Sequence, residues 1–198
     1  MEQLIGIDLI ELLKTIGYVG IFLIIFAESG LFFGFFFPGD SLLFSAGILA
    51  ATGIFDITLL IPLLVVAAIS GDSVGYWFGT KIGPSLFTRP DSLFFHREYV
   101  IRTENFYNKY GKKTIVLARF VPIVRTFAPI IAGIAKMDYL TFIRYNIFGG
   151  LIWAIFIPLS GYLLGNSIPN VDHYLLLIVI LITLTSFLPI ISEYYRKN

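Results

Sequence analysis

The sequence predicts an all-α integral membrane protein with an inverted repeat, in which each half holds a re-entrant helical hairpin and a transmembrane helix. Three observations lead to this fold class. Hydrophobic residues make up 57% of the 198 residues and charged residues only 14%, about half the charged share of a soluble domain. Several apolar runs approach or exceed the roughly 20 residues that cross a bilayer. Two of the runs are broken by proline and contain ionisable side chains, which is tolerated where broken helices line protein or water.

Composition also excludes several classes of protein. No polar stretch is long enough to form an appended soluble domain, so residues 1–198 are predicted to form a single multi-pass domain in the cytoplasmic membrane. A net charge of +1 gives no electrostatic reason to expect a nucleic-acid partner. The chain has no cysteine, which excludes disulfides, thiol catalysis and thiolate metal sites.

The first repeat is assigned to residues 15–80. Its first apolar run covers residues 15–37 and ends at Pro38-Gly39-Asp40, where the chain changes direction. The apolar sequence resumes over residues 41–55, and a full-length span follows over residues 57–80. This repeat therefore reads as an apolar hairpin followed by one crossing.

A basic linker over residues 81–113 separates the two repeats and sets their orientation. It holds seven lysines and arginines against three acidic residues, whereas the turns near 53–57 and 166–172 contain no lysine or arginine. The positive-inside rule makes the linker cytoplasmic and the two turns external. In this orientation the segments 28–52 and 114–136 each begin and end on one side of the membrane, so both are predicted to be re-entrant.

The second repeat is assigned to residues 114–165, and a C-terminal span follows over residues 173–192. A shift of 86 residues aligns two motifs of the first repeat with the second: Ala46-Gly47 with Ala132-Gly133, and Gly75-Tyr76-x-x-Gly79 with Gly161-Tyr162-x-x-Gly165. The two hairpins enter from opposite faces, so the repeats are inverted, as in many secondary transporters.

Four ionisable side chains lie at membrane depth in the hairpins: Glu28, Asp40, Arg119 and Arg125. Each charged group at a helix centre costs roughly 2.5–3.5 kcal/mol, so the four together cost about 10 kcal/mol. They are therefore expected to face one another or a hydrated cavity. One interpretation is a structural clamp that holds the hairpins together. The other is an anion site, because guanidinium groups bind phosphate bidentately and keep their charge.

The acidic residues leave further alternatives open. Glu28 and Asp40 can act as counter-charges to the arginines, or as groups that couple proton movement to transport. Asp72 lies inside a span, before a glycine-tyrosine motif, and reads as a buried hydrogen-bonding or helix-packing residue rather than a proton site. The glycines at positions 71, 75 and 79 have the spacing that permits close helix packing.

Three stretches of sequence carry a resemblance to a known family. The first is Glu28 with Phe35-Phe36-Phe37-Pro38-Gly39-Asp40-Ser41-Leu42-Leu43, the second is Gly71-Asp72-x-x-Gly75-Tyr76-x-x-Gly79, and the third is Arg119-Phe120-x-Pro122-x-x-Arg125 followed by Ala132-Gly133. Together they resemble the DedA family of bacterial and archaeal membrane proteins, over roughly residues 17–165. The resemblance implies a domain shared with eukaryotic lipid scramblases and a role in returning undecaprenyl phosphate to the cytoplasmic leaflet. The family's functional acids and arginines correspond to Glu28, Asp40, Arg119 and Arg125.

The leading functional hypothesis is a lipid-phosphate flippase, coupled to a proton gradient, in which Arg119 and Arg125 bind the headgroup. Alternatives are a proton-coupled exporter of small ions and a general phospholipid scramblase; the arginine pair argues against a cation as substrate. An enzyme is not expected, because no histidine lies in the hairpins and Ser41 has no base visible in the sequence. We expect no catalytic residue, metal or cofactor; the expected partners are the lipid phosphate and membrane lipid, and homo-oligomer formation stays open.

Overall fold

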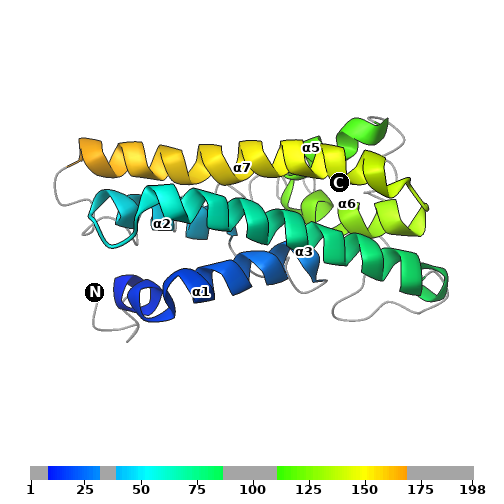
Figure 1. The fold of residues 1–198 in the computed structure, drawn as a ribbon, viewed down its shortest axis with the longest axis horizontal. Coiled ribbons are helices and arrows are strands. Elements are labelled where there is room, and N and C mark those ends of the chain that lie inside the picture. The colour runs from blue at the N-terminus through cyan, green and yellow to red at the C-terminus, as the bar shows by residue number, and fades with distance from the viewer. Residues whose placement is uncertain (1–8, 32–38, 87–110, 169–198) are drawn as a thin grey trace, which may run out of the picture. The chain divides into compact units, whose positions relative to one another are not determined.

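The computed structural model describes residues 9–31, 39–86 and 111–168, and every regular element in these ranges is helical (Figure 1). The elements are α1 (Leu9–Gly30), α2 (Gly39–Ala51), α3 (Ile57–Leu86), η3 (Gly111–Lys113), α5 (Thr114–Ala118), α6 (Pro122–Ile134) and α7 (Tyr139–Ser167). The all-α prediction is confirmed for the described residues. The C-terminal span, most of the basic linker and the turn at Pro38 lie outside them.

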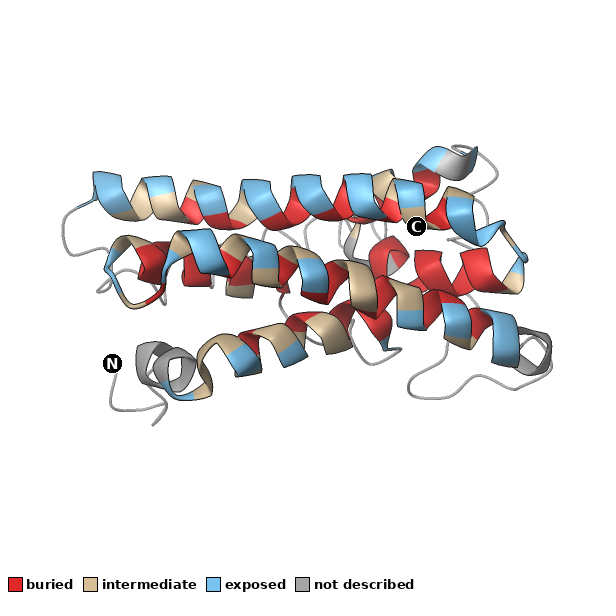
Figure 2. Ribbon diagram, viewed as in Figure 1, coloured by how far each residue is buried: buried red, intermediate tan, exposed pale blue. Residues whose placement is uncertain are grey.

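Two of these helices are long and apolar enough to cross a membrane: residues Ile57–Lys81 of α3 and the whole of α7. With a rise of 1.5 Å per residue, their 25 and 29 residues exceed the roughly 30 Å of a bilayer's hydrocarbon core. Exposed and buried stripes alternate along both helices (Figure 2). On α7 the exposed stripe includes Phe148, Phe156 and Leu163, each more than half exposed. Such a surface is suited to contact with lipid chains.

The helices fall into two compact units. The first unit contains the described parts of Met1–Ile21, Pro38–Ile61 and Phe156–Asn198, and the second contains those of Phe22–Phe37 and Pro62–Ile155. Helices α1, α3 and α7 each contribute to both units. All of α2 belongs to the first unit, and all of α5 and α6 to the second.

In the first unit, α2 packs closely on the C-terminal part of α7 through glycines. A β-carbon at Gly47 would lie 2.0 Å from the carbonyl oxygen of Pro158, and one at Gly161 would lie 2.2 Å from that of Phe44. The two backbones approach so closely because no side chain stands between them, as small-residue interfaces allow in membrane helices.

The second unit repeats this arrangement with α6 and α3. A β-carbon at Gly133 would lie 2.1 Å from the carbonyl oxygen of Tyr76, and one at Gly79 would lie 2.1 Å from that of Ile130. The hydroxyl of Tyr76 also donates a hydrogen bond to the carbonyl of Met137, at the end of the turn that leaves α6. Each short helix therefore packs on the long helix of the other sequence repeat.

An aspartate caps the N-terminus of each long helix. Asp56 accepts hydrogen bonds from the backbone N–H of Thr58, two residues later, at 2.8 Å and from its hydroxyl. Asp138 accepts both kinds of hydrogen bond from Thr141, three residues later, with the N–H at 2.9 Å. The hydrogen bond from the Thr58 side chain is the largest cause that lowers the pKa of Asp56 below its usual value. For Asp138 the largest such cause is the hydrogen bond from the Thr141 backbone. Both capping carboxylates are therefore ionised at neutral pH.

These contacts correct the repeat register expected from the sequence. The short helices follow the expected shift of 86 residues, which relates Gly47 to Gly133. The long helices follow a shift of 82, which relates the capping Asp56 to Asp138 and the packing Gly79 to Gly161. The alignment of Gly75-Tyr76 with Gly161-Tyr162 is therefore offset by about one helical turn. The spacing from the packing glycine to the capping aspartate is nine positions in the first copy (Gly47 to Asp56) and five in the second (Gly133 to Asp138).

Alanine substitutions one turn apart on α3 test this packing. Gly79→Ala would force a β-carbon against the Ile130 carbonyl and is expected to lower stability by about 1–3 kcal/mol. Gly75→Ala is the matched control, because its β-carbon would meet its nearest neighbours at an ordinary 3.4 Å. Thermal unfolding of the purified proteins in detergent measures both effects. Equal destabilisation by the two substitutions would contradict the close contact at Gly79.

Candidate functional site

A break between two helices positions both arginines of the second hairpin. Helix α5 ends at Ala118, Arg119 follows as its C-cap, and α6 begins at Pro122. Proline suits the first turn of a helix, because its missing N–H would have no helical partner there and its φ is already helical. Pro122 therefore stands at a helix break, as expected, whereas Pro129 lies inside α6, which continues past it.

Arg125 forms a buried ion pair with Glu28 of α1. The Nη2 group of Arg125 donates a hydrogen bond to Oε1 of Glu28, and the side chains are 7% and 1% exposed. Breaking such a pair by removing one partner leaves an uncompensated buried charge, at a cost of about 3–5 kcal/mol. The pair joins residues that are 97 positions apart in the sequence.

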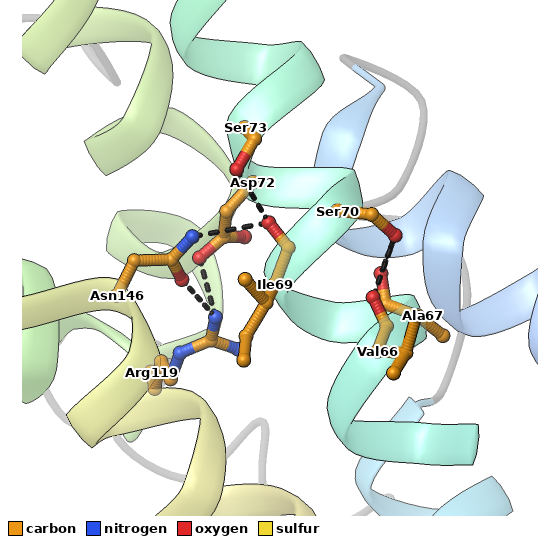
Figure 3. Close-up of polar contacts among 8 residues, drawn as sticks. All are labelled: Val66, Ala67, Ile69, Ser70, Asp72, Ser73, Arg119 and Asn146. Carbon is orange, nitrogen blue, oxygen red and sulfur yellow. Dashed lines mark hydrogen bonds and ion pairs between the residues drawn. The ribbon is translucent and has the colours of Figure 1, made fainter. Parts of the chain in front are cut away.

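Arg119 forms the second buried ion pair, with Asp72 of α3 (Figure 3). Its Nη2 group donates to Oδ2 of Asp72 at 2.5 Å and to Oδ1 of Asn146 at 2.6 Å. The amide nitrogen of Asn146 donates in turn to the carbonyl of Ile69, at 3.1 Å. Asn146 thus links the arginine on one side to the backbone of α3 on the other.

Trp153 of α7 lies against both arginines. The guanidinium carbon of Arg125 is 5.0 Å from the centre of the indole ring, and that of Arg119 is 5.8 Å from it. Both distances fall within the range of cation–π attraction, which is stronger when the pair is removed from water. Trp153 is itself 1% exposed. The ring therefore supports two buried cations that would otherwise repel each other.

Two adjacent glycines of α7 leave room for the Arg119 side chain. A β-carbon at Gly149 would lie 3.2 Å from Cδ of Arg119, and one at Gly150 would lie 3.5 Å from its Nη2. The glycines stand one turn from Asn146 and one turn from Trp153, on the same helix. Consecutive turns of α7 thus supply space for the Arg119 side chain, a hydrogen-bond acceptor and an aromatic face.

The Asp72–Arg119 pair leaves several polar atoms unsatisfied. Nε and Nη1 of Arg119 and Oδ1 of Asp72 are buried, and within the described residues they have no hydrogen-bond partner. Buried polar groups in proteins nearly always have a partner, from protein or from water. Two guanidinium nitrogens in this site are consequently available to an additional ligand.

The structure brings together three of the four residues expected at the site. Glu28, Arg119 and Arg125 belong to the second unit, whereas Asp40 lies in the first turn of α2, in the first unit. The carboxylate paired with Arg119 is Asp72, which agrees with its interpretation as a buried hydrogen-bonding residue. Within the described ranges, no group of histidine, cysteine and acidic side chains could hold a metal ion.

Asn146 and Trp153 were missed by the sequence analysis. Their signal is visible in retrospect: a polar amide inside an apolar span, two glycines one turn later, and a tryptophan seven residues after the amide. This spacing places all four residues on one face of a helix. Apolar periodicity alone does not reveal it, because tryptophan and glycine are also common in helices that only contact lipid.

The described residues are all helical apart from their turns, and they include two apolar helices of spanning length and two buried arginine–carboxylate pairs. These features belong to a helical membrane protein. A VTT domain is recognised over residues 37–163. The chain belongs to the DedA family of membrane proteins, which is identified through this domain and through the relatives described next.

Similar proteins cover most of the chain. It is 45% identical to Protein DedA of Escherichia coli strain K12, over 98% of this chain and 90% of the relative. It is 45% identical to the membrane protein Rv0364 of Mycobacterium tuberculosis, over 86% of this chain and 75% of the relative. It is 34% identical to the inner membrane protein YqjA of Escherichia coli K12, over 76% of this chain and 68% of the relative. No solved structure gave a significant match.

Leucine substitutions separate the structural contribution of the Asp72–Arg119 pair from any other role. Asp72→Leu alone leaves Arg119 buried without its carboxylate and is expected to destabilise the protein by about 3–5 kcal/mol. The double variant Asp72→Leu/Arg119→Leu removes both charges and should recover most of that loss. Denaturant unfolding in detergent measures both changes. A double variant that is less stable than Asp72→Leu would contradict the ion-pair assignment.

Proposed function

We propose that the protein is a transporter that moves an anionic lipid phosphate across the cytoplasmic membrane, with the headgroup bound by Arg119 and Arg125. The observation that carries this proposal is the pair of buried guanidinium groups beside Trp153, each balanced by one carboxylate. The substrate is undecaprenyl phosphate or a related polyprenyl phosphate, returned to the cytoplasmic leaflet. This choice of lipid and direction follows the family resemblance.

The chemistry of the site favours a phosphate over other ligands. Guanidinium groups recognise phosphate oxygens through two parallel N–H donors, and they keep their charge when buried. A phosphate monoester carries about 1.5 to 2 negative charges at neutral pH, which matches the two cations. A small cation would instead be repelled by both arginines. The same arginines would hold the headgroup while the prenyl chain stays in lipid, beside apolar helix faces.

The fold supports a route through the membrane for such a headgroup. Helix α5 and helix α6 are separated by a break at which Arg119 stands, and breaks at membrane depth are tolerated where they line protein or water. We take residues 28–52 and 114–136 as re-entrant hairpins that enter from opposite faces. This inverted arrangement would open the site alternately to either side, as in other inverted-repeat transporters.

Glu28 is the carboxylate best placed to couple transport to protons. It is the partner of Arg125, so an incoming phosphate competes with it for the guanidinium group. A carboxylate that has lost its arginine in a low-dielectric site is more stable when it is protonated. The proton would be released when the headgroup leaves and the pair forms again. Asp40 keeps its proposed coupling role on the evidence of the sequence motif alone.

Arg125→Lys tests whether phosphate geometry matters as well as charge. Lysine keeps the positive charge but loses the planar pair of donors, so most transport of a fluorescent polyprenyl phosphate in liposomes should be lost while the protein still folds. Arg144→Lys is the matched control, because Arg144 is exposed on α7. Full transport by Arg125→Lys would instead assign this arginine a point-charge or structural role.

Glu28→Gln tests the coupling. Glutamine keeps an oxygen for Arg125 but cannot take up a proton, so the variant should still equilibrate the lipid slowly and should lose its acceleration by an imposed pH gradient. Asp138→Asn serves as the control, because the exposed Asp138 is replaced by another good helix cap. Gradient-driven transport at the wild-type rate in Glu28→Gln would remove Glu28 from the coupling.

A further inference from the structure

The Asp72–Arg119 pair is held by a single nitrogen of the guanidinium group. Nη2 carries two hydrogens, and the two acceptors within reach of it are Oδ2 of Asp72 and Oδ1 of Asn146. Arginine–carboxylate pairs frequently use two nitrogens in a parallel fork. Here the fork is not formed, although the second oxygen of Asp72 and two further nitrogens of Arg119 are buried nearby.

The unused nitrogens are Nε and Nη1. Both are buried in a side chain that is only 2% exposed, and they have no hydrogen-bond partner among the described residues. With both hydrogens of Nη2 engaged, a ligand bound by Arg119 is left with these two nitrogens. Their N–H bonds diverge, so each donates a single hydrogen bond rather than one arm of a parallel fork. The orientation of the guanidinium plane is thereby set before any ligand arrives.

Asn146 is itself fixed at both ends of its amide. Its oxygen accepts from Arg119, and its nitrogen donates to the carbonyl of Ile69 on α3, which also accepts from the hydroxyl of Ser73 (Figure 3). An amide held in this way cannot rotate without losing a hydrogen bond in a buried site, which is costly. Asn146 is fully buried, so water cannot replace either contact easily.

We propose that Asp72 and Asn146 are positioning residues: they hold Nη2 of Arg119 and so fix the plane of the guanidinium group, which leaves an N–H of Nε or Nη1 to donate a single hydrogen bond to a phosphate oxygen of the ligand. This inference rests on the proposed function. It separates the two carboxylates by role, because Asp72 keeps its arginine throughout, whereas Glu28 yields Arg125 to the headgroup. The shared ligand chemistry is a phosphate group, whether on a lipid or free.

Trp153 provides a direct measurement of ligand binding at this site. The chain has two tryptophans, and the other, Trp77, is 59% exposed on α3. In a Trp77→Phe background all tryptophan emission comes from Trp153, beside both guanidinium groups. Geranyl phosphate is expected to change this emission saturably and geraniol is not. A separate titration with inorganic phosphate distinguishes a site for a free anion from a site for a lipid headgroup. The lipid assignment requires geranyl phosphate to bind more tightly than inorganic phosphate.

A double-mutant cycle in this background tests the positioning role. Asn146→Leu removes a hydrogen bond to a charged group and should weaken binding of geranyl phosphate about tenfold. In an Arg119→Lys protein the same substitution should have almost no further effect, because lysine has no guanidinium plane to orient. Ser70→Ala is the control, since its hydroxyl bonds only to carbonyls of its own helix, and it should leave binding unchanged.

Variants of Asp72, the other positioning residue, keep the test decisive if Asn146→Leu fails to fold. Asp72→Asn keeps an oxygen for Nη2 and should weaken binding only about threefold, whereas Asp72→Leu should weaken it at least as much as Asn146→Leu. Equal loss in Asp72→Asn and Asp72→Leu would overturn the positioning role.

The cycle also separates this inference from the proposed function. If Asn146→Leu weakens binding tenfold both with Arg119 and with Arg119→Lys, or weakens it in neither protein, the positioning role is overturned. Binding of geranyl phosphate by the parent protein would still uphold the proposed function. A parent protein whose Trp153 emission responds to neither phosphate compound would overturn both.

Discussion

Two arginine–carboxylate pairs, buried among apolar helices, determine which helices of the second unit must meet. A charge left alone in this environment would cost several kcal/mol, so each arginine requires a carboxylate from a distant part of the chain. Glu28 comes from α1 and Asp72 from α3, while both arginines flank the break between α5 and α6. Four helical segments are therefore tied to one point in the second unit.

Glycine contacts make this convergence possible. The carbonyls of Tyr76 and Ile130 lie where a β-carbon of Gly133 or Gly79 would otherwise stand, so α6 and α3 come close enough for their charged residues to share one site. Gly149 and Gly150 do the same for α7, whose next turn supplies Trp153. Close backbone approach replaces the hydrophobic driving force, which is weak between helices in lipid. Packing and electrostatics thus act on the same set of contacts.

The two units share a packing arrangement. The described part of the second unit contains two arginine–carboxylate pairs, and in the first unit the short helix α2 packs on α7 through Gly47 and Gly161. The repeated aspartate caps, at Asp56 and Asp138, show that the long helices begin alike. The two arginine–carboxylate pairs thus lie in the second unit. The spacing from packing glycine to capping aspartate is four positions longer in the first copy than in the second.

The amino-acid sequence alone predicts the helical membrane class, the proline break before α6, and three of the residues that the structure brings together: Glu28, Arg119 and Arg125. Composition and the cost of isolated charges in lipid are enough for these, because they depend on local chemistry. The three-dimensional arrangement was needed to show that Asp72 pairs with Arg119, that Asn146 and Trp153 contact the same arginine, and that the long helices are related by a shift of 82 positions. These depend on which helix faces meet. Glycine contacts, and a glycine-to-aspartate spacing that is four positions shorter in the second copy, set that register, and neither leaves a periodic signal in the sequence.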